Sequence, residues 1–285
     1  MKVFIIIFIV LFVLMLAAGA NTLRVIGRGN RRYFQSSGEK SLTIRSFDGL
    51  KLVADVVNDT ASKGTILCFH GYHSGPVRDF SSIYELYTRL GCRTVFVHQR
   101  AHGRSEGKFT GLGILERKDC LAWINHINDL YGKENPVFLS GVSMGAATVL
   151  MAAGEALPEN VKGIIADCGF TSPKEILKYV MKNKYHLPPA TFLPFMSLVI
   201  RMTAGYRTDA YSTLEAMKKN KLPVLFIHGK ADCFVPCSMT LENYEAANKN
   251  ARLLLIEGAR HTKSFETDPN RYIRYVQDFI LKYEC

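Results

Sequence analysis

The stretch Val137–Met151, VFLSGVSMGAATVLM, decides the fold of this 285-residue chain. A short apolar run of strand type leads into the five residues Gly141 to Gly145, and a run of small and apolar residues that favours a helix follows. A serine in the tight turn between such a strand and helix is sterically strained, and glycines two residues to either side relieve the clash. The pattern therefore predicts that Ser143 is exposed at the start of a helix, as a nucleophile.

Strand-like and helix-like segments alternate on both sides of this stretch. Ser41 to Val57 has the pattern of a hairpin that turns at Asp48-Gly49. Six further apolar, often β-branched runs are expected strands: Thr65 to Phe69, Thr94 to Val97, Val137 to Leu139, Val161 to Ala166, Pro223 to Ile227 and Ala251 to Ile256. Amphipathic stretches such as Asp79 to Leu90 and Leu112 to Leu130 lie between most of them. The chain is therefore predicted to be an α/β protein with a mostly parallel eight-stranded sheet and helices on both faces.

Two residues that follow expected strands complete a catalytic set with Ser143. Ligands of such sheets bind at the carboxyl ends of the strands. Asp232 ends the loop His228-Gly229-Lys230-Ala231-Asp232, and His261 follows the last expected strand, 89 and 118 residues after the serine. The chain order serine, acid, histidine is that of one known class of hydrolytic triad. We expect Ser143 to be the nucleophile, His261 the general base and Asp232 the acid that orients it, with Asp167 as the less favoured acid.

The other histidines have weaker positions than His261. His70, His102 and His228 each precede a glycine at an expected turn, where a histidine usually serves as a structural hydrogen-bonding group. The remaining four do not follow a strand downstream of the nucleophile: His73, His98, His126 and His186. We expect the first three to brace loops.

Hydrolysis through a serine also needs two backbone N–H groups directed at the developing oxyanion. Met144, directly after the nucleophile, is expected to supply one. The loop after Thr65 to Phe69 is expected to supply the other through Tyr72, because Gly71 lets the backbone approach closely.

The motifs together resemble those of the α/β-hydrolase superfamily. From about Leu42 onward the chain is similar to its serine aminopeptidase/monoglyceride-lipase-like group, near the bacterial Bem46-like hydrolases. The resemblance rests on Phe69 to Tyr72, Gln99 to Gly107, Gly141 to Gly145, His228 to Asp232 and Gly258 to His261. It implies an esterase, lipase, thioesterase or peptidase without choosing among them. Gln99 departs from the pattern, since such relatives often carry Asp there. This departure affects the bracing of a loop rather than the triad.

Residues 172–221 interrupt the alternation and are expected to form a short helical lid. Ser172 to Glu175 has the pattern of a capping box with a proline in the first helical turn. The very apolar segment Phe192 to Met202 fits either the packing core of the lid or a roof over an acyl pocket.

The N-terminus is expected to be a hydrophobic helix that precedes the catalytic domain. Val3 to Ala20 are 18 uncharged residues, so residues 1–20 are predicted to be a membrane anchor, with a signal peptide cleaved after Ala20 as the alternative. Residues 21–40 form a basic linker that contains Arg24, Arg28, Arg31 and Arg32. By the positive-inside rule an anchor would leave the domain, residues 41–285, in the cytoplasm, whereas cleavage would give a secreted enzyme.

Composition limits the other classes of function. The net charge of +11 is partly concentrated behind the apolar N-terminus, and the other cations lack the aromatic interleaving of a nucleic-acid groove, so we expect no nucleic-acid partner. Seven scattered cysteines favour a reducing compartment. Cys233 and Cys237 have no second Cys/His pair at metal spacing, which argues against zinc, and their own pairing stays open. We expect neither a metal nor a cofactor.

The sequence thus predicts a serine hydrolase that cleaves carboxylic esters, with thioesters or amides as further substrates, through an acyl-enzyme on Ser143. The alternatives are an aminopeptidase-like amide hydrolase and a catalytically silent α/β-hydrolase that only binds. The expected partners are a small acyl substrate and membrane lipid at the N-terminal helix. The acyl chain, the leaving group and the oligomeric state stay open.

Overall fold

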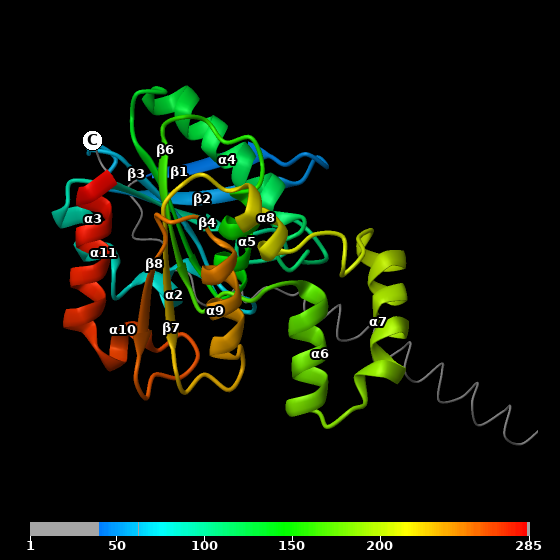
Figure 1. The fold of residues 1–285 in the computed structure, drawn as a ribbon. Coiled ribbons are helices and arrows are strands. Elements are labelled where there is room, and N and C mark those ends of the chain that lie inside the picture. Colours follow the sequence, from blue (N-terminus) through cyan, green and yellow to red (C-terminus); the bar gives the residue numbers. More distant parts are fainter. Residues whose placement is uncertain (1–39, 62, 284–285) are drawn as a thin grey trace, which may run out of the picture.

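An eight-stranded sheet between two layers of helices forms the body of the protein in the computed structural model, which describes residues 40–61 and 63–283 (Figure 1). The strands are β1 (Lys40–Arg45), β2 (Lys51–Val57), β3 (Thr65–Phe69), β4 (Arg93–His98), β5 (Val137–Val142), β6 (Val161–Asp167), β7 (Val224–Gly229) and β8 (Arg252–Ile256). The helices are α2 (Pro76–Phe80), α3 (Tyr84–Arg89), α4 (Glu116–Tyr131), α5 (Met144–Ala152), α6 (Pro173–Asn183), α7 (Pro189–Ala204), α8 (Thr213–Lys219), α9 (Cys237–Ala246), α10 (Ser264–Thr267) and α11 (Pro269–Tyr283).

The strand order β1-β2-β4-β3-β5-β6-β7-β8 confirms the predicted mostly parallel sheet. Only β2 runs antiparallel to its neighbours, because the hairpin turns at Asp48-Gly49, where Gly49 has a φ of +86°. All pairs from β4 to β8 are parallel. The carboxyl ends of these six strands therefore meet at one edge, where the candidate site is built.

Alternating side chains divide the core between the two faces of the sheet. On β3, Leu67 and Phe69 point into one hydrophobic cluster, while Ile66 and Cys68 point into the other. The first cluster packs under α4, α5 and α8, and the second packs under α2, α3 and α11. Since β3 is buried on both faces, its sequence is a continuous apolar run rather than an alternating one.

Two expected helical segments differ from the structure. The stretch Asp79 to Leu90 forms two short helices, α2 and α3, instead of one. The first begins one turn earlier at Pro76, whose fixed φ suits a helix start, and Ser81-Ser82 favour the turn that separates the two. In residues 172–221, α6 and α7 stand side by side away from the sheet (Figure 1), whereas α8 packs against α5 in the core.

The start of α6 follows the sequence pattern at its first turn. Ser172 is the N-cap residue, and its hydroxyl accepts a hydrogen bond from the Glu175 N–H at 3.1 Å. A complete capping box lies at α8 instead, where Ser212 and Glu215 bond to one another's backbone N–H groups.

The expected N-terminal helix and basic linker, residues 1–40, lie outside the described residues except for Lys40, which begins β1. Over residues 40–61 and 63–283, the structure has no helix that is long and apolar enough to span a membrane.

Candidate active site

Ser143 occupies a strained turn between β5 and α5. Its φ of +54° is unfavourable for a residue with a side chain, and two glycines make the turn sterically feasible. A Cβ at Gly141 would lie 2.3 Å from the Gly145 carbonyl oxygen, and a Cβ at Gly145 would lie 1.8 Å from that of Phe69. The Ser143 N–H donates to the Asp167 carbonyl oxygen at 2.8 Å, which holds the turn to the next strand.

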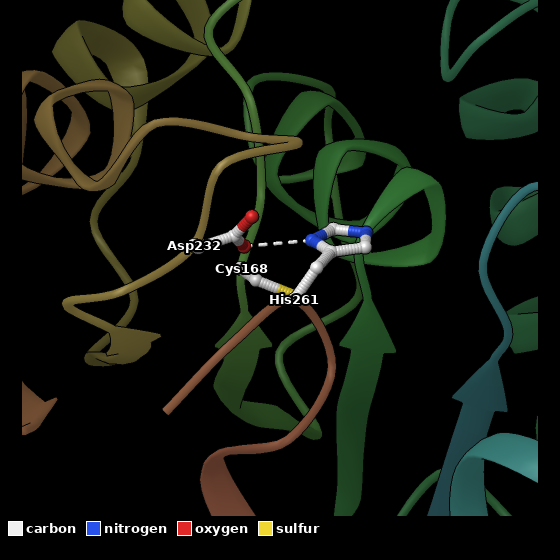
Figure 2. Close-up of side chains that lie close together, drawn as sticks. All are labelled: Cys168, Asp232 and His261. Atoms are coloured by element: carbon white, nitrogen blue, oxygen red, sulfur yellow. Dashed lines mark hydrogen bonds and ion pairs between the residues drawn. The ribbon is translucent and has the colours of Figure 1, made fainter. Parts of the chain in front are cut away.

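His261 lies between the serine and a carboxylate. Its Nε2 is 3.0 Å from the Ser143 Oγ. Its Nδ1 is 2.7 Å from the Asp232 Oδ2, the contact drawn in Figure 2. Because a carboxylate only accepts, the proton belongs on Nδ1, and Nε2 is left to accept the proton of the serine hydroxyl. The loop after β8 thus positions the imidazole as a general base towards Ser143.

Asp232 is fixed by more than its bond to His261. Its Oδ1 accepts from the N–H groups of Phe234 and Val235 at 2.8 and 2.9 Å, and its Oδ2 lies 3.2 Å from the His228 Nε2. Burial tends to raise the pKa of Asp232, but the hydrogen bonds from His228, His261 and the Val235 backbone outweigh it and hold the pKa well below the usual value. Asp232 is therefore an ionised partner for the imidazole.

The alternative acid, Asp167, is bonded elsewhere. Its carboxylate accepts from the Ser264 hydroxyl at 3.2 Å and from Tyr272. Complete burial raises the pKa of Asp167 to about 6, although His228, Tyr272 and Ser264 oppose the rise. The carboxylate that reaches His261 is that of Asp232, as the sequence favoured.

The loop of Gly71 and Tyr72 lies against the nucleophile. A Cβ at Gly71 would be 3.3 Å from the Ser143 Cβ, so the glycine permits the close approach that the sequence predicted. Among the described residues, no protein acceptor bonds to the N–H of Tyr72 or of Met144. Tyr72 follows Gly71 directly and Met144 follows Ser143 directly, so the two residues expected to bind the oxyanion adjoin this close contact.

Asp79 holds this loop on both sides of Tyr72 and was not anticipated from the sequence. Its carboxylate accepts from the Gly71 N–H and from the Ser74 hydroxyl, both at 2.6 Å. No local pattern marks Asp79 for this role, because it lies in a short helix eight residues beyond the glycine.

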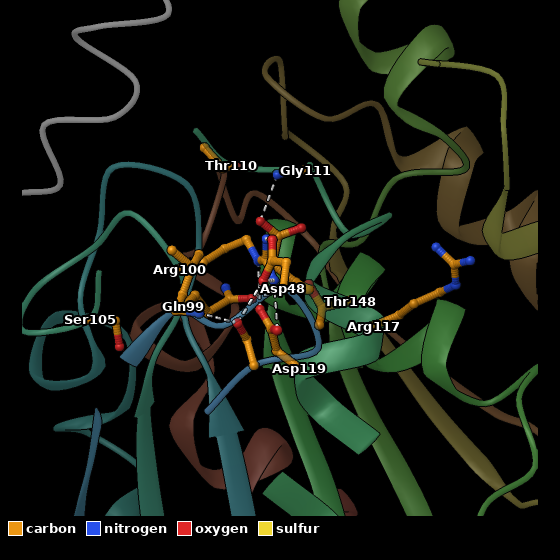
Figure 3. A network of polar contacts seen from close by, with 12 residues as sticks. Asp48, Gln99, Arg100, Ser105, Thr110, Gly111, Arg117, Asp119 and Thr148 are labelled. Atoms are coloured by element: carbon orange, nitrogen blue, oxygen red, sulfur yellow. Dashed lines mark hydrogen bonds and ion pairs between the residues drawn. The ribbon is translucent and has the colours of Figure 1, made fainter. Parts of the chain in front are cut away.

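Gln99 holds the same peptide group from its carbonyl side and connects it to the helix of the nucleophile. Its side-chain amide donates to the His70 carbonyl oxygen, and its Oε1 accepts from the Thr148 hydroxyl at 3.1 Å (Figure 3). His70, whose pKa burial lowers to about 4, accepts from the Gln99 N–H through Nε2 and donates through Nδ1 to the Gly71 carbonyl oxygen. The residue that departs from the family pattern is thus part of the bracing of the loop.

Arg100 fixes the chain after β4 from the opposite side. It is 2% exposed and donates two hydrogen bonds to Asp119 of α4, at 2.6 and 2.7 Å, and two to Asp48 at 2.9 and 3.2 Å (Figure 3). These bonds outweigh the effect of burial and raise the pKa of Arg100. They join the β1–β2 turn, α4 and the end of β4 around the base of the site.

The histidines expected to brace loops have that role. His102 bonds through Nδ1 to the Arg100 carbonyl oxygen at 2.9 Å. His228 contacts the Thr240 hydroxyl at 2.7 Å and the Val235 carbonyl oxygen at 3.0 Å, besides Asp232.

An apolar and largely aromatic environment surrounds the reactive groups. The Phe234 ring lies 5.0 Å from the His261 ring. A hydrophobic cluster joins Met144, the first residue of α5, to Ile176 of α6, and Tyr72, Tyr179 and Phe234 pack against this cluster. The inner face of α6 therefore borders the place where an acyl or leaving group would lie.

Cys168 lies beneath the triad without taking part in its hydrogen bonds (Figure 2). One donor atom from each of Cys168, Asp232 and His261 falls within 4.8 Å of the others. Burial and the nearby carboxylates of Asp167 and Asp232 raise the pKa of the Cys168 thiol well above its usual value, and a metal would have to displace the Asp232–His261 bond. This donor set is unfavourable for a metal ion. Cys233 and Cys237 are free thiols.

The comparisons with known proteins agree with this geometry. Residues 64–196 match the family model described as the alpha/beta hydrolase fold. The uncharacterized protein YqkD of Bacillus subtilis is 29% identical over 247 residues, which cover 87% of this chain and 81% of that protein. Caffeoylshikimate esterase of Arabidopsis thaliana is 30% identical over 165 residues, but these cover 56% of this chain and only 46% of that enzyme. A solved structure of the Pyrococcus furiosus esterase Pf2001 superimposes with a TM-score of 0.74 at 22% identity, and covers 90% of this chain and 98% of the esterase.

Proposed function

Because this chain belongs to the α/β-hydrolase superfamily, we propose that it is a serine hydrolase that cleaves carboxylic esters through an acyl-enzyme on Ser143. One observation carries the proposal: the Ser143 Oγ, the His261 imidazole and the Asp232 carboxylate form a continuous chain of contacts, 3.0 and 2.7 Å long. This series of contacts begins at Ser143, whose backbone is held in a strained turn. Strain of this kind is typical of functional sites.

The proposed reaction starts with attack of the Ser143 Oγ on the ester carbonyl carbon, while the His261 Nε2 takes the hydroxyl proton. Asp232 stabilises the imidazolium, and the N–H groups of Tyr72 and Met144 donate to the oxyanion. When the tetrahedral intermediate collapses, His261 returns the proton to the leaving alkoxide, which departs as the alcohol. A water molecule then attacks the acyl-enzyme with His261 again as base, and the acid and the free serine are released.

Esters are favoured over aminoacyl substrates by the groups around the site. An α-ammonium group would need a carboxylate to bind, but Asp79 already accepts two hydrogen bonds and Asp232 orients the histidine. The Lys184 Nζ lies 5.4 Å from the centre of the Phe234 ring, next to His261, where it would repel a second cation. The names of the Arabidopsis and Pyrococcus relatives, both esterases, support the same class.

A fluorophosphonate probe tests the proposal directly, because it labels only a serine that a base activates. We expect labelling of the full chain at Ser143 and turnover of p-nitrophenyl butyrate, with both lost in Ser143→Ala. A protein that is neither labelled nor active on p-nitrophenyl esters of any chain length would be the silent binding protein instead. Thioesters and amides belong in the same screen, since their cleavage uses the same acyl-enzyme.

We propose a membrane location on the sequence alone. The apolar residues 3–20 would span about 27 Å as a helix, close to the thickness of the bilayer core. The arginines that follow would keep the catalytic domain in the cytoplasm. Edman sequencing of the native protein separates the alternatives, since Met1 in the membrane fraction supports the anchor and Asn21 in the medium supports a secreted enzyme.

A further inference from the structure

The outer surface of α6, α7 and their connection exposes an unusual amount of apolar side chain. Eight large hydrophobic residues are exposed in the part of the chain that the structure describes, and four of them lie between positions 185 and 202. They are Tyr185, Leu187, Leu198 and Met202, which are 60, 39, 50 and 77% exposed. The concentration of half of them in α7 and in the connection that precedes it marks a surface that binds something.

The exposed residues of α7 form one stripe. Pro194, Leu198 and Met202 follow one another at intervals of four, so they lie on the same side of the helix, and all three are exposed. Leu193, Val199 and Ile200 on the other side are buried. An apolar stripe that faces solvent cannot be explained by packing within the described chain.

A groove of about 540 Å³ lies between α6 and α7 along the edge of this stripe. Its lining includes the buried Leu193 and two residues of the stripe itself, Pro194 and Leu198. Four cationic side chains line it: Lys174, Lys178, Arg201 and Arg207. Over residues 172–209 there are six Lys or Arg residues and only two acids, Glu175 and Asp209.

We propose that the outer surface of α6 and α7 docks on an anionic phospholipid bilayer. The stripe of Pro194, Leu198 and Met202 enters the headgroup region, and the cations around the groove contact lipid phosphates. Charge complementarity selects this partner, because aliphatic groups and cations alternate on one surface as they do on peripheral membrane helices. A nucleic acid would match the charge but would leave the aliphatic stripe exposed to water.

Docking would place the bilayer next to the candidate active site. The inner face of α6 packs through Ile176 into the cluster that contains Met144, and Tyr185 lies close enough to Tyr72 to raise the pKa of its phenol together with the larger effect of burial. Docking of this surface depends only on its exposed apolar side chains and its charge. The lipid experiment below therefore tests it independently of the hydrolase activity.

A tryptophan reporter at Leu198 tests the proposal in the full 285-residue chain. The chain has a single tryptophan, Trp123, which is fully buried in the core and gives a constant background. The matched control is Leu281→Trp, because Leu281 is 46% exposed, close to the 50% of Leu198, but lies on α11 at the opposite side of the sheet (Figure 1). Each variant is mixed with vesicles of phosphatidylcholine, with or without phosphatidylglycerol, that contain brominated acyl chains.

We expect vesicles with phosphatidylglycerol to shift the emission of Leu198→Trp to shorter wavelength and to quench it, and to leave Leu281→Trp unchanged. Adding Lys174→Glu and Arg201→Glu to Leu198→Trp should raise the lipid concentration for half-maximal shift at least about tenfold, since each change replaces an attraction to anionic lipid by a repulsion. Retention of the far-ultraviolet circular dichroism spectrum excludes unfolding.

Four results would overturn the proposal. One is an unchanged emission of Leu198→Trp on anionic vesicles, and another is an equal shift on pure phosphatidylcholine. The third is an emission already shifted before lipid is added, which would mean that another protein segment or a second copy covers α7. Equal quenching of Leu281→Trp would likewise show that the surface is not specific.

Discussion

The His261 Nδ1 lies 2.7 Å from the Asp232 Oδ2, whereas the Asp167 carboxylate bonds to Ser264 and Tyr272. Asp232→Asn should therefore lower kcat about 10⁴-fold, because an amide favours the wrong imidazole tautomer while the serine and the oxyanion donors remain. Asp167→Asn should lower kcat less than about tenfold, because it leaves the His261 tautomer unchanged. Steady-state rates on p-nitrophenyl butyrate compare the two variants, and a larger loss in Asp167→Asn would reverse the assignment.

Ser143 and His261 act in one covalent step, so their losses should not add. Ser143→Ala and His261→Ala should each reduce kcat by about 10⁶-fold, and the double variant should be no worse than either one. Rates from single-turnover experiments give the comparison, with circular dichroism as the check that each variant is folded. A double variant that is far slower than both singles would mean that the two residues contribute separately.

The sequence was sufficient to predict the framework of the sheet and the residues that end its strands. Runs such as Thr65 to Phe69 are buried on both faces, and burial of that kind appears in the sequence as unbroken apolar residues. The turn at Ser143 was predictable because it is sterically possible only with glycine at positions 141 and 145, and both glycines are visible in the sequence. Asp232 and His261 come together because parallel strands bring their carboxyl ends to one edge.

The bracing of the oxyanion loop could not be predicted, because it depends on contacts between distant segments. Gln99 bonds to residues 29 positions before it and 49 positions after it, and neither contact has a periodic signal. Only its departure from the family pattern drew attention to Gln99. The break between α2 and α3 has a different, local cause: the turn preference of Ser81-Ser82 interrupts an otherwise amphipathic stretch.

Removal of the Gln99–Thr148 contact should slow the reaction with little effect on substrate binding. In Thr148→Val the Gln99 carbonyl loses its partner, so the loop that carries the Tyr72 N–H is held less firmly relative to α5. We expect kcat to fall about ten- to a hundredfold with KM changed less than about threefold, since small displacements of oxyanion donors are costly. Steady-state kinetics of Thr148→Val and of the parent chain measures both kcat and KM.

Thr148→Ser is the matched control, because it keeps the hydroxyl that donates to Gln99. It should retain most of the activity of the parent chain. Thr148→Val keeps the methyl group and loses the hydroxyl, whereas Thr148→Ser does the reverse, so equal losses of activity would mean that packing at this position, rather than the hydrogen bond to Gln99, is responsible.

Asp167 should make the stability of the fold depend on pH. Its pKa is raised to about 6 by burial, while an unfolded carboxyl group has a pKa of about 3.9. Between these values the folded chain binds a proton that the unfolded chain does not, so the contribution of Asp167 to stability rises as the pH falls from 6 towards 4. The contribution above pH 6 is unfavourable and amounts to at most roughly 3 kcal/mol.

Asp167→Asn removes this titration. From about pH 7 to about pH 4, the free energy of unfolding in urea should therefore fall more steeply for Asp167→Asn than for the parent chain. Other titrating groups, including His70, contribute equally to both proteins. Parallel curves for the two proteins would show that Asp167 has the same pKa in the folded and unfolded states.

Discrimination against aminoacyl substrates is best measured with two esters that differ in a single group. Methyl 4-methylpentanoate and leucine methyl ester have the same branched chain and leaving group, but only the second carries an α-ammonium group. The nearby carboxylates already accept hydrogen bonds, and Lys184 lies next to Phe234, so the ammonium group would lose water without gaining a counter-ion and would be repelled by a like charge. We expect kcat/KM for methyl 4-methylpentanoate to exceed that for leucine methyl ester at least about a hundredfold, which corresponds to roughly 3 kcal/mol.

Lys184→Glu should narrow this ratio of kcat/KM values about three- to tenfold, because it replaces repulsion by attraction at a partly solvated site. The control is Lys162→Glu, a substitution on β6 away from Phe234, which should leave the ratio unchanged. Faster turnover of leucine methyl ester by the parent chain would instead identify an aminopeptidase-like hydrolase.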